Sequence, residues 1–172
     1  MNSERISDRS GEKTLFIKLA YDLKFRFIMR TVTFMEEQIL LEAKISNIYK
    51  LADFIDRHLS SLRVSPAEEM KIQMVCEELF VNIAHYAYAP NHGNCLVTVK
   101  TDEKENAIEI VLSDWGVPFN PLAKKDPDVT LPISQRKIGG LGIYLVKKEV
   151  NGVTYRREDG VNILWLKKRF RG

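Results

Sequence analysis

Residues 65–88 have the hydrophobic pattern that organises this sequence. Apolar side chains recur there three or four positions apart, which predicts one α-helix with a stripe facing a core. Ser65 is the predicted N-cap, with Pro66 in the first turn and Glu68 completing a capping box. The apolar stripe consists of Ile72, Val75, Cys76, Leu79 and Ile83.

Glu78, Asn82 and His85 form a second stripe on the same predicted helix. Residues three and four positions apart stand above one another on a helix, so this carboxylate, carboxamide and imidazole share one side. Polar groups at the border of a buried helix need hydrogen-bonding partners or a chemical role. We therefore take Glu78 and Asn82 as candidates for a functional site, with a solvated helix edge as the alternative.

The rest of the chain alternates between strand and helix patterns. Ser46 is the expected cap of the first helix, and Asp159-Gly160 is expected to form the turn of the last hairpin. Beside 65–88, the predicted elements are a strand at 37–45, a helix at 48–62, strands at 95–101 and 107–113, a helix from Gly142 to about 150, and strands at 153–157 and 161–168. A mostly antiparallel sheet with helices on one face, an α+β fold of two layers, is the simplest arrangement of these elements.

Residues 117–138 have no periodic pattern, and four prolines there prevent a long helix. A loop of this length is often a lid over a site. It leads to Gly139-Gly140-Leu141-Gly142, where the backbone N–H groups of a glycine-rich helix start can approach phosphate. An ordinary turn into a helix is the alternative. Asp114-Trp115-Gly116 stands before the loop, at the predicted end of a strand.

Composition narrows the class of protein. A chain of 172 residues suits one domain with some extra length, and its two cysteines fit a reducing cytoplasm without a disulfide framework or metal site. No uncharged apolar run is long enough to span a membrane. The net charge of +3 comes entirely from residues 1–34, which hold seven basic and four acidic residues. The remainder is neutral, so direct nucleic-acid binding is not expected.

Residues 1–34 are predicted to be an extension, and residues 35–172 the domain. Part of the extension has the pattern of a basic amphipathic helix, which would suit a membrane surface or a partner. Two other interpretations stay open: the extension is disordered, or translation begins at Met29 or Met35 and the extension is not native.

Three motifs together resemble those of one superfamily. CEELFVNIAHYAY, which begins at Cys76, is similar to the N box, DWGVPF to the first glycine box, and GGLGIYLV to the second glycine box of the Bergerat-fold (GHKL) ATPases. The similarity runs from about residue 37 to the end. Within the superfamily, the small size and a glutamate four residues before the N-box asparagine look most like the RsbW-type anti-sigma-factor serine kinases.

The resemblance implies roles at the phosphate end of a bound ATP. Asn82 would be a ligand of Mg²⁺, since its amide oxygen is a hard donor. Glu78 would be the general base that takes the proton of a serine hydroxyl. Arg136 and Lys137, at the end of the lid, would neutralise charge on the β- and γ-phosphates, with a solvated lid as the alternative. Glu77 points about 100° away from Glu78 and is the poorer base.

The resemblance also implies how the rest of the nucleotide is held. Asp114 would bind the adenine amino group, and Gly116 would let the base approach the backbone. Gly140 and Gly142 would shape the phosphate end. The chain departs from the family at Gly160-Val161-Asn162, where such kinases often have threonine after the glycine. His85 follows Asn82 by three residues instead of four, so no catalytic role is assigned to it.

Two functions follow from the resemblance. In the first, the chain phosphorylates a STAS-domain antagonist and holds a sigma factor in the other partner state. In the second, it is a nucleotide-dependent binding module that switches partners without transferring phosphate. A detached histidine-kinase domain fits less well, because it needs a phosphoacceptor helix. Relatives form homodimers, but no motif in this sequence reports on its oligomeric state.

Overall fold

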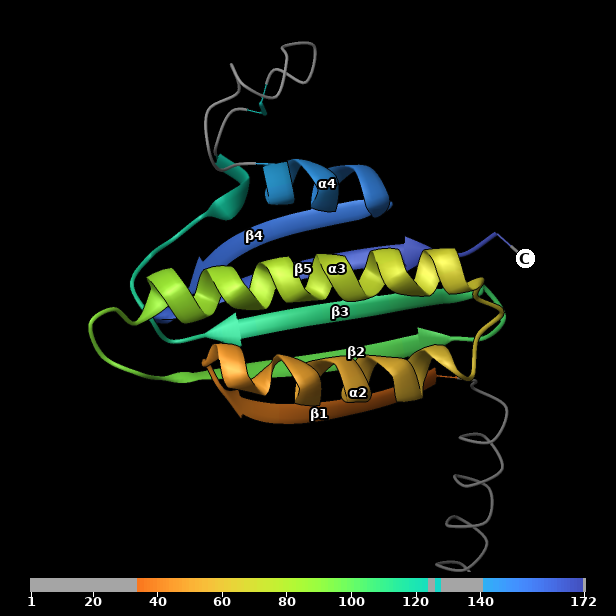
Figure 1. The fold of residues 1–172 in the computed structure, drawn as a ribbon, viewed down its shortest axis with the longest axis horizontal. Helices are drawn as coiled ribbons and strands as arrows, with labels where there is room; N and C mark the ends of the chain where they lie inside the picture. The colour runs from red at the N-terminus through yellow and green to blue at the C-terminus, as the bar shows by residue number, and fades with distance from the viewer. Residues whose placement is uncertain (1–33, 124–125, 128–140, 172) are drawn as a thin grey trace, which may run out of the picture. The chain divides into compact units, whose positions relative to one another are not determined.

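The computed structural model describes residues 34–123, 126–127 and 141–171. Five strands form one sheet in the order β1-β2-β3-β5-β4, and all four pairings are antiparallel (Figure 1). The strands are β1 (Phe34–Glu42), β2 (Asn94–Asp102), β3 (Ala107–Asp114), β4 (Gly152–Glu158) and β5 (Val161–Arg169). Every predicted strand is present, although β1 begins earlier and ends earlier than expected.

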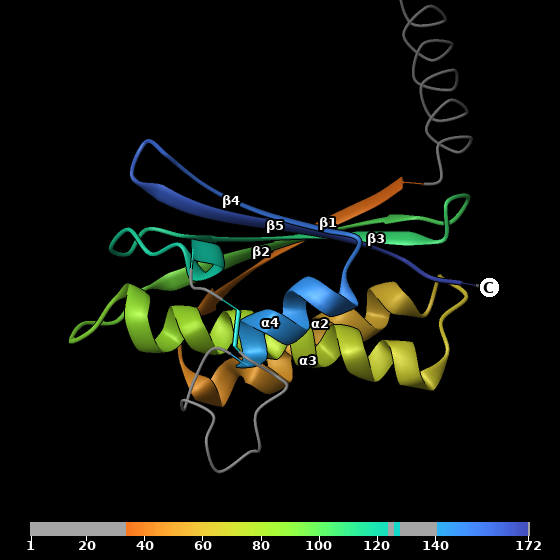
Figure 2. The same cartoon turned by 90° about the horizontal axis from the view of Figure 1, so that it is seen from above.

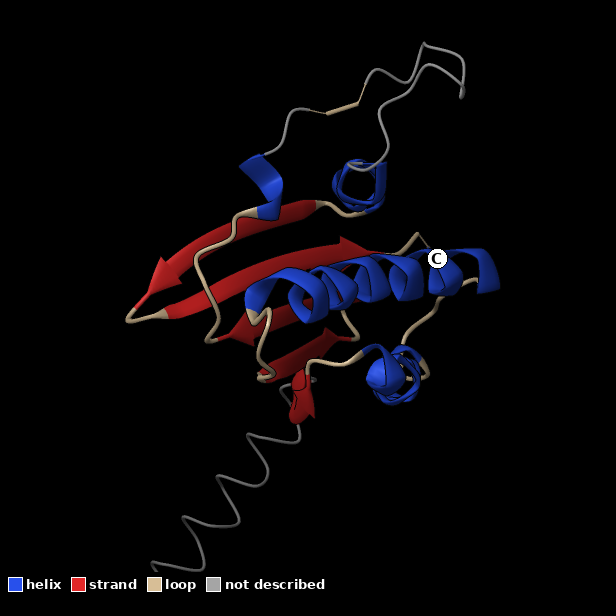
Figure 3. Ribbon diagram, turned by 60° about the vertical axis from the view of Figure 1, so that its left-hand side comes forward, coloured by secondary structure: helices blue, strands red, loops and turns tan. Residues whose placement is uncertain are grey.

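Three helices cover one face of the sheet, and no described helix covers the other (Figure 2). They are α2 (Ile48–Leu59), α3 (Pro66–Asn82) and α4 (Leu141–Glu149). The central helix, α3, packs against α2 on one side and α4 on the other, as Figures 1 and 3 show. The predicted two-layer α+β fold is therefore confirmed.

The core lies between the sheet and these helices. All five residues of the stripe predicted on α3 and its continuation are buried, and Ile72 and Val75 have no exposed surface. Alternate residues of β2 and β3 face them, as expected for a sheet with one covered face. The residues of β2 and β3 with no exposed surface are Cys95, Val97, Val99, Ile108 and Ile110. Burial raises the pKa of the Cys76 thiol to about 12.

Helix α3 begins at the predicted residue. The Ser65 hydroxyl accepts a hydrogen bond from the Glu68 N–H at 3.3 Å, and Pro66 occupies the first turn. The Glu68 carboxylate accepts from the Ser65 hydroxyl instead of the Ser65 main-chain N–H, so the capping box is incomplete. The predicted cap of α2 was wrong: Ser46 lies inside a 3₁₀ turn, η1 (Ile45–Asn47), and Asn47 precedes the helix.

The predicted helix at 65–88 changes from α-helical to π-helical geometry near its end. It is α-helical only to Asn82 and continues as a π-helical turn, η2 (Ile83–Ala87). Each π turn takes in one more residue than an α turn, so the predicted three-residue alignment of Asn82 with His85 does not hold. His85 is exposed, and its ring contacts the ring of Tyr86.

Several predictions lie outside the described residues. Residues 1–33 of the predicted extension at 1–34 are among them, so the boundary between extension and domain stays a prediction. Arg136, Lys137, Gly140 and most of the proposed lid also fall outside, while its start contains a short 3₁₀ turn, η3 (Pro121–Ala123). None of the helices in the described part of the chain has the length and apolar character needed to cross a membrane.

Candidate active site

Glu78 and Asn82 lie one turn apart near the end of α3, and their side chains are in contact. The Asn82 amide nitrogen donates to the Glu78 main-chain carbonyl at 2.7 Å and to Glu78 Oε1 at 2.9 Å. Both partners can only accept, so the nitrogen of the carboxamide must face Glu78. Asn82 Oδ1 and Glu78 Oε2 are the atoms left without a hydrogen bond from the described residues.

Gly142, in the first turn of α4, lies directly against the Glu78 carboxylate. A Cβ atom at this position would be 2.1 Å from Glu78 Cδ and 2.3 Å from each carboxylate oxygen, well inside contact distance. Any larger residue would force the carboxylate or the helix to move. Glycine therefore allows α4 to pack on α3 here. The carboxylate borders a groove between the two helices that Met74, Val81 and Leu145 also line.

Asp114 ends β3 and is almost fully buried, with 5% of its surface exposed. Its Oδ1 accepts two hydrogen bonds, from the Gly116 N–H at 2.9 Å and from Asn162 Nδ2 at 2.8 Å. Its Oδ2 accepts none from the residues that the structure describes. The carboxylate is therefore fixed through one oxygen, and the other is available to a ligand.

Asn162, which the sequence marked only as a departure from the family pattern, is the centre of this hydrogen-bond network. It donates to Asp114 Oδ1 and to the Val117 carbonyl at 3.0 Å. Its carbonyl oxygen accepts from the Tyr155 hydroxyl at 2.8 Å and from Arg157 Nη1 at 2.6 Å. The pairing of β3 with β5 places it opposite Asp114. That register joins residues far apart in the chain, so local sequence patterns do not reveal it.

Gly116 contacts the end of the π-helical turn. A Cβ atom there would be 2.1 Å from the Ala87 carbonyl oxygen, and the next N–H, of Val117, donates to that same oxygen at 2.8 Å. The Tyr88 hydroxyl accepts from the Trp115 N–H at 2.8 Å, and burial raises the pKa of this phenol. Close packing on Ala87 thus requires glycine at 116, independently of any ligand.

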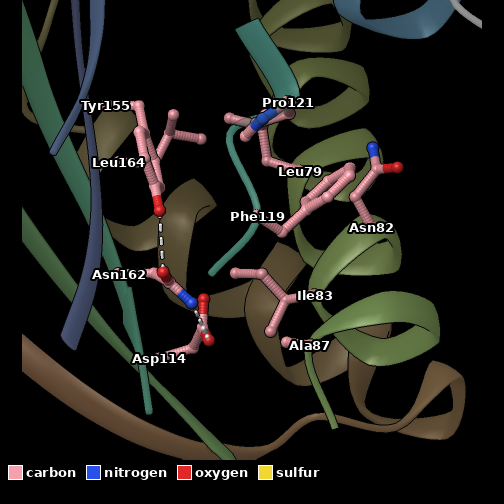
Figure 4. A pocket seen from close by; sticks show the side chains of 10 residues that line it. All are labelled: Leu79, Asn82, Ile83, Ala87, Asp114, Phe119, Pro121, Tyr155, Asn162 and Leu164. Carbon is pink, nitrogen blue, oxygen red and sulfur yellow. Dashed lines mark hydrogen bonds between the residues drawn. The ribbon is translucent and has the colours of Figure 1, made fainter. Parts of the chain in front are cut away.

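A small pocket of about 20 Å³, partly open to solvent, lies between α3, its π-helical turn and the sheet (Figure 4). Its walls are mostly apolar, with a few polar groups, as is usual for small-molecule sites. Figure 4 shows the Phe119 ring between Asn82 on the helix and the Asp114–Asn162 pair on the sheet. The lining residues are Leu79, Asn82, Ile83, Ala87, Asp114, Phe119, Pro121, Tyr155, Asn162 and Leu164.

The candidate residues thus fall around two adjoining hollows. Asn82 and Asp114 line the pocket, whereas Glu78 and Gly142 line the groove between α3 and α4. The hydrogen bond from Asn82 to Glu78 connects the two. Gly116 lines neither hollow but holds the loop that carries the pocket wall. The structure therefore brings five predicted residues together.

Relatives of known name match parts of this chain. Serine/threonine-protein kinase BtrW of Bordetella bronchiseptica is 25% identical over 96 residues, which are 55% of this chain and 66% of that protein. Serine-protein kinase RsbW of Staphylococcus aureus is 30% identical over 104 residues, which are 58% of this chain and 64% of that protein. The chain thus matches slightly less than two thirds of the length of either kinase.

Among solved structures, that of the RsbU and RsbW domains of Rv1364c from Mycobacterium tuberculosis contains a region with the same fold, with a TM-score of 0.54 at 14% identity. That match covers 78% of this chain and 32% of the other. The family model described as "Histidine kinase-like ATPase domain" matches residues 41–168. These residues include the last two residues of β1, all of β2, β3 and β4, β5 except Arg169, all three helices and both hollows. The chain therefore belongs to the family of histidine kinase-like ATPase domains.

Proposed function

We propose that this chain is a protein-serine kinase that uses ATP and Mg²⁺ to phosphorylate a STAS-domain anti-sigma antagonist, and that it holds a sigma factor in the other partner state. Membership of the ATPase family supports the use of ATP, and the similarity to RsbW and BtrW supports serine as the acceptor. One observation carries the proposal: Glu78 and Asn82 meet where the pocket adjoins the groove.

The pocket is the proposed binding site of the nucleotide base. Asp114 Oδ2 is an acceptor in a nearly buried position, which suits the exocyclic amine of adenine. Leu79, Ile83 and Leu164 supply apolar surface on both sides of the pocket for a planar ring. In this proposal Gly116 acts indirectly, by allowing the loop after β3 to pack against Ala87.

The groups near Asn82 fit Mg²⁺ bound together with phosphates. Within the described part of the chain, no three His, Cys, Asp or Glu side chains gather as a metal site. Mg²⁺ in kinases takes few protein ligands, because phosphate oxygens and waters complete its shell. Asn82 Oδ1 is the open oxygen of its carboxamide and is the ligand we propose. Gly140, Arg136 and Lys137 are proposed to contact the phosphates together with the start of α4 at Gly142.

Glu78 is the proposed general base. Its Oε1 is held by Asn82, so Oε2 is the oxygen that takes the proton from a serine hydroxyl. ATP, when bound, supplies the phosphoryl group, and the serine oxygen forms the new bond to phosphorus as the bond to ADP breaks. The carboxylate faces the groove and not the base pocket, which leaves the groove side for the acceptor protein.

Two neighbouring acids allow a matched test. We expect Glu78→Gln to lower phosphoryl transfer by about 10² to 10⁴-fold while ATP affinity changes little, because only proton transfer is lost. Glu77→Gln changes the exposed acid one residue away, which also lines the groove but does not contact Asn82, and it should lower transfer by less than about tenfold. The measurement is transfer from γ-labelled ATP with Mg²⁺ to purified STAS-domain proteins of the source organism, with ATP binding measured by calorimetry.

The outcomes separate the kinase from the binding module. The kinase function is supported if the unaltered protein transfers phosphate to a STAS-domain protein, Glu78→Gln does not, and Glu77→Gln still does. ATP binding without transfer to any STAS-domain protein would favour a module that switches partners without chemistry. Equal transfer by Glu78→Gln and the unaltered protein would remove Glu78 as the base.

A further inference from the structure

The pocket proposed for the base is smaller than a base. Its volume of about 20 Å³ gives room for little more than one water molecule. Pockets that hold drug-sized ligands usually enclose about 300 to 1,000 Å³. Closely packed side chains do not compress to admit a ring. A purine can therefore enter this pocket only if at least one of the side chains that line it moves.

The lining side chains differ in how firmly they are held. The four polar ones take part in the hydrogen bonds described above, and Pro121 is buried within η3. Four apolar ones belong to the core and are each at most 9% exposed, namely Leu79, Ile83, Ala87 and Leu164. Phe119 is partly exposed, and among the described lining residues it alone lies outside every helix, strand and 3₁₀ turn. Moving its side chain therefore disturbs the least structure.

The Phe119 ring also lies in the path of a nucleotide. Figure 4 shows the ring between Asn82 on α3 and the Asp114–Asn162 pair on the sheet. In the complex proposed above, the base binds Asp114, and the phosphates lie at the Mg²⁺ held by Asn82. A nucleotide that makes both contacts spans the same space. The ring and a bound base cannot both occupy it.

Tyr86 offers the Phe119 ring a contact outside the pocket. It lies on the π-helical turn, does not line the pocket and has 52% of its surface exposed. The centroids of the two rings are 5.6 Å apart, with 37° between their planes. Contacts between aromatic rings at this separation are favourable. A Phe119 ring that moves outward along Tyr86 therefore keeps an aromatic neighbour.

We propose that the Phe119 ring and the adenine base compete for the same space, and that nucleotide binding moves the ring outward onto Tyr86. The proposal rests on the nucleotide-binding function proposed above and adds a residue that controls access to that site. Only molecules with the ring outside the pocket bind the base, so the apparent dissociation constant exceeds the intrinsic one by the inverse of their fraction. Phe119 thus lowers the affinity for ATP although it lines the pocket.

A smaller side chain at position 119 removes this competition. We expect Phe119→Ala to lower the dissociation constant for ATP about three- to tenfold, because the pocket is then open in nearly all molecules. The gain should appear as faster association with an unchanged dissociation rate. Phe119→Leu, which keeps a smaller apolar side chain, should bind with intermediate affinity. Trp115→Ala is the matched control: it removes an exposed ring of the same loop that does not line the pocket, and ATP affinity should not change.

The test is calorimetric titration of the full chain with ATP and Mg²⁺, together with stopped-flow fluorescence of ribose-labelled ATP for the two rates. Tighter binding by Phe119→Ala through faster association supports the proposal. Binding that is equal or weaker, or tighter only through slower dissociation, would overturn it and leave the proposed kinase intact. The same criteria apply to Phe119→Leu if circular dichroism shows Phe119→Ala to be unfolded. Absence of ATP binding in the unaltered protein and in both variants would overturn the competition and the proposed kinase together.

Discussion

The two ends of β3 each have a buried asparagine with several hydrogen bonds, but the partners differ in kind. Asn106 directly precedes the strand and is 5% exposed, and Asn162 faces its last residue and is 3% exposed. Asn106 binds only main-chain groups: its side chain accepts from the Arg63 N–H at 2.9 Å and donates to the carbonyls of Arg63 and Phe170. Asn162 binds mainly side chains around the pocket.

This difference in hydrogen-bond partners distinguishes an asparagine with a structural role from one at the candidate functional site. The Asn106 side chain joins the turn before β3 to two other segments, namely the connection from α2 to α3 and the residue after β5. Asn162 instead fixes a carboxylate that keeps one oxygen open beside the pocket. Burial and the number of bonds are similar, so neither identifies a functional asparagine. The identity of the partner does.

The largest expected effect is at the pocket end of β3. We expect Asp114→Ala to weaken ATP binding at least 100-fold, because the charged acceptor for the base is lost. The variant should retain most of its stability. Asp102→Ala is the matched control, since Asp102 ends the neighbouring strand β2 far from the pocket and receives the N–H groups of Lys104 and Glu105. Calorimetry with ATP measures both, and unchanged affinity in Asp114→Ala would remove the adenine assignment.

At the other end of β3, we expect a change in stability and none in ATP affinity. We expect Asn106→Ala to lower the free energy of unfolding by about 2 kcal/mol, because the partly buried main-chain groups of Arg63 and the buried carbonyl of Phe170 lose their partner. ATP affinity of the folded protein should not change. Urea denaturation measures the first quantity and calorimetry the second.

A glycine variant separates the side chain from the backbone at this position. Asn106 has φ of 48°, in the left-handed region that disfavours alanine. Asn106→Gly should therefore be about 1 kcal/mol more stable than Asn106→Ala while losing the same side-chain bonds. If both variants unfold at the same urea concentration as the unaltered protein, the Asn106 side chain does not stabilise this end of β3. The contrast between the two ends of the strand then fails.

These two asparagines also mark the limit of what the sequence predicts. The contact between Glu78 and Asn82 depends on helical spacing within four residues, so it was predictable. Gly142 against Glu78 and Asn162 against Asp114 depend on the packing of α4 and on the register of β5, which local patterns do not encode. The π-helical turn after Asn82 was missed for a similar reason: it replaces an α turn within a continuous apolar stripe.

The smallest expected effect is in the middle of β3, on the face that no described helix covers. Lys167 Nζ donates to Glu109 Oε1 at 2.8 Å and holds the Glu109 pKa below its usual value. Because the folded state favours the charged form, this contribution is present near pH 7 and is lost as pH falls through the folded pKa. Glu109→Gln should cost under about 1 kcal/mol at pH 7, since the pair is partly exposed and solvent screens it.

The pH dependence distinguishes this pair from the buried asparagines. By urea denaturation, the difference between Glu109→Gln and the unaltered protein should shrink as pH falls through the folded pKa of Glu109, and disappear at a pH low enough to protonate the carboxyl group in both folded and unfolded chains. The deficit of Asn106→Ala should persist there, because an amide does not titrate. Glu103→Gln, in the exposed turn before β3, is the control for a change of charge alone. A Glu109→Gln deficit that is constant with pH would mean that packing, and not the ion pair, holds the middle of the strand.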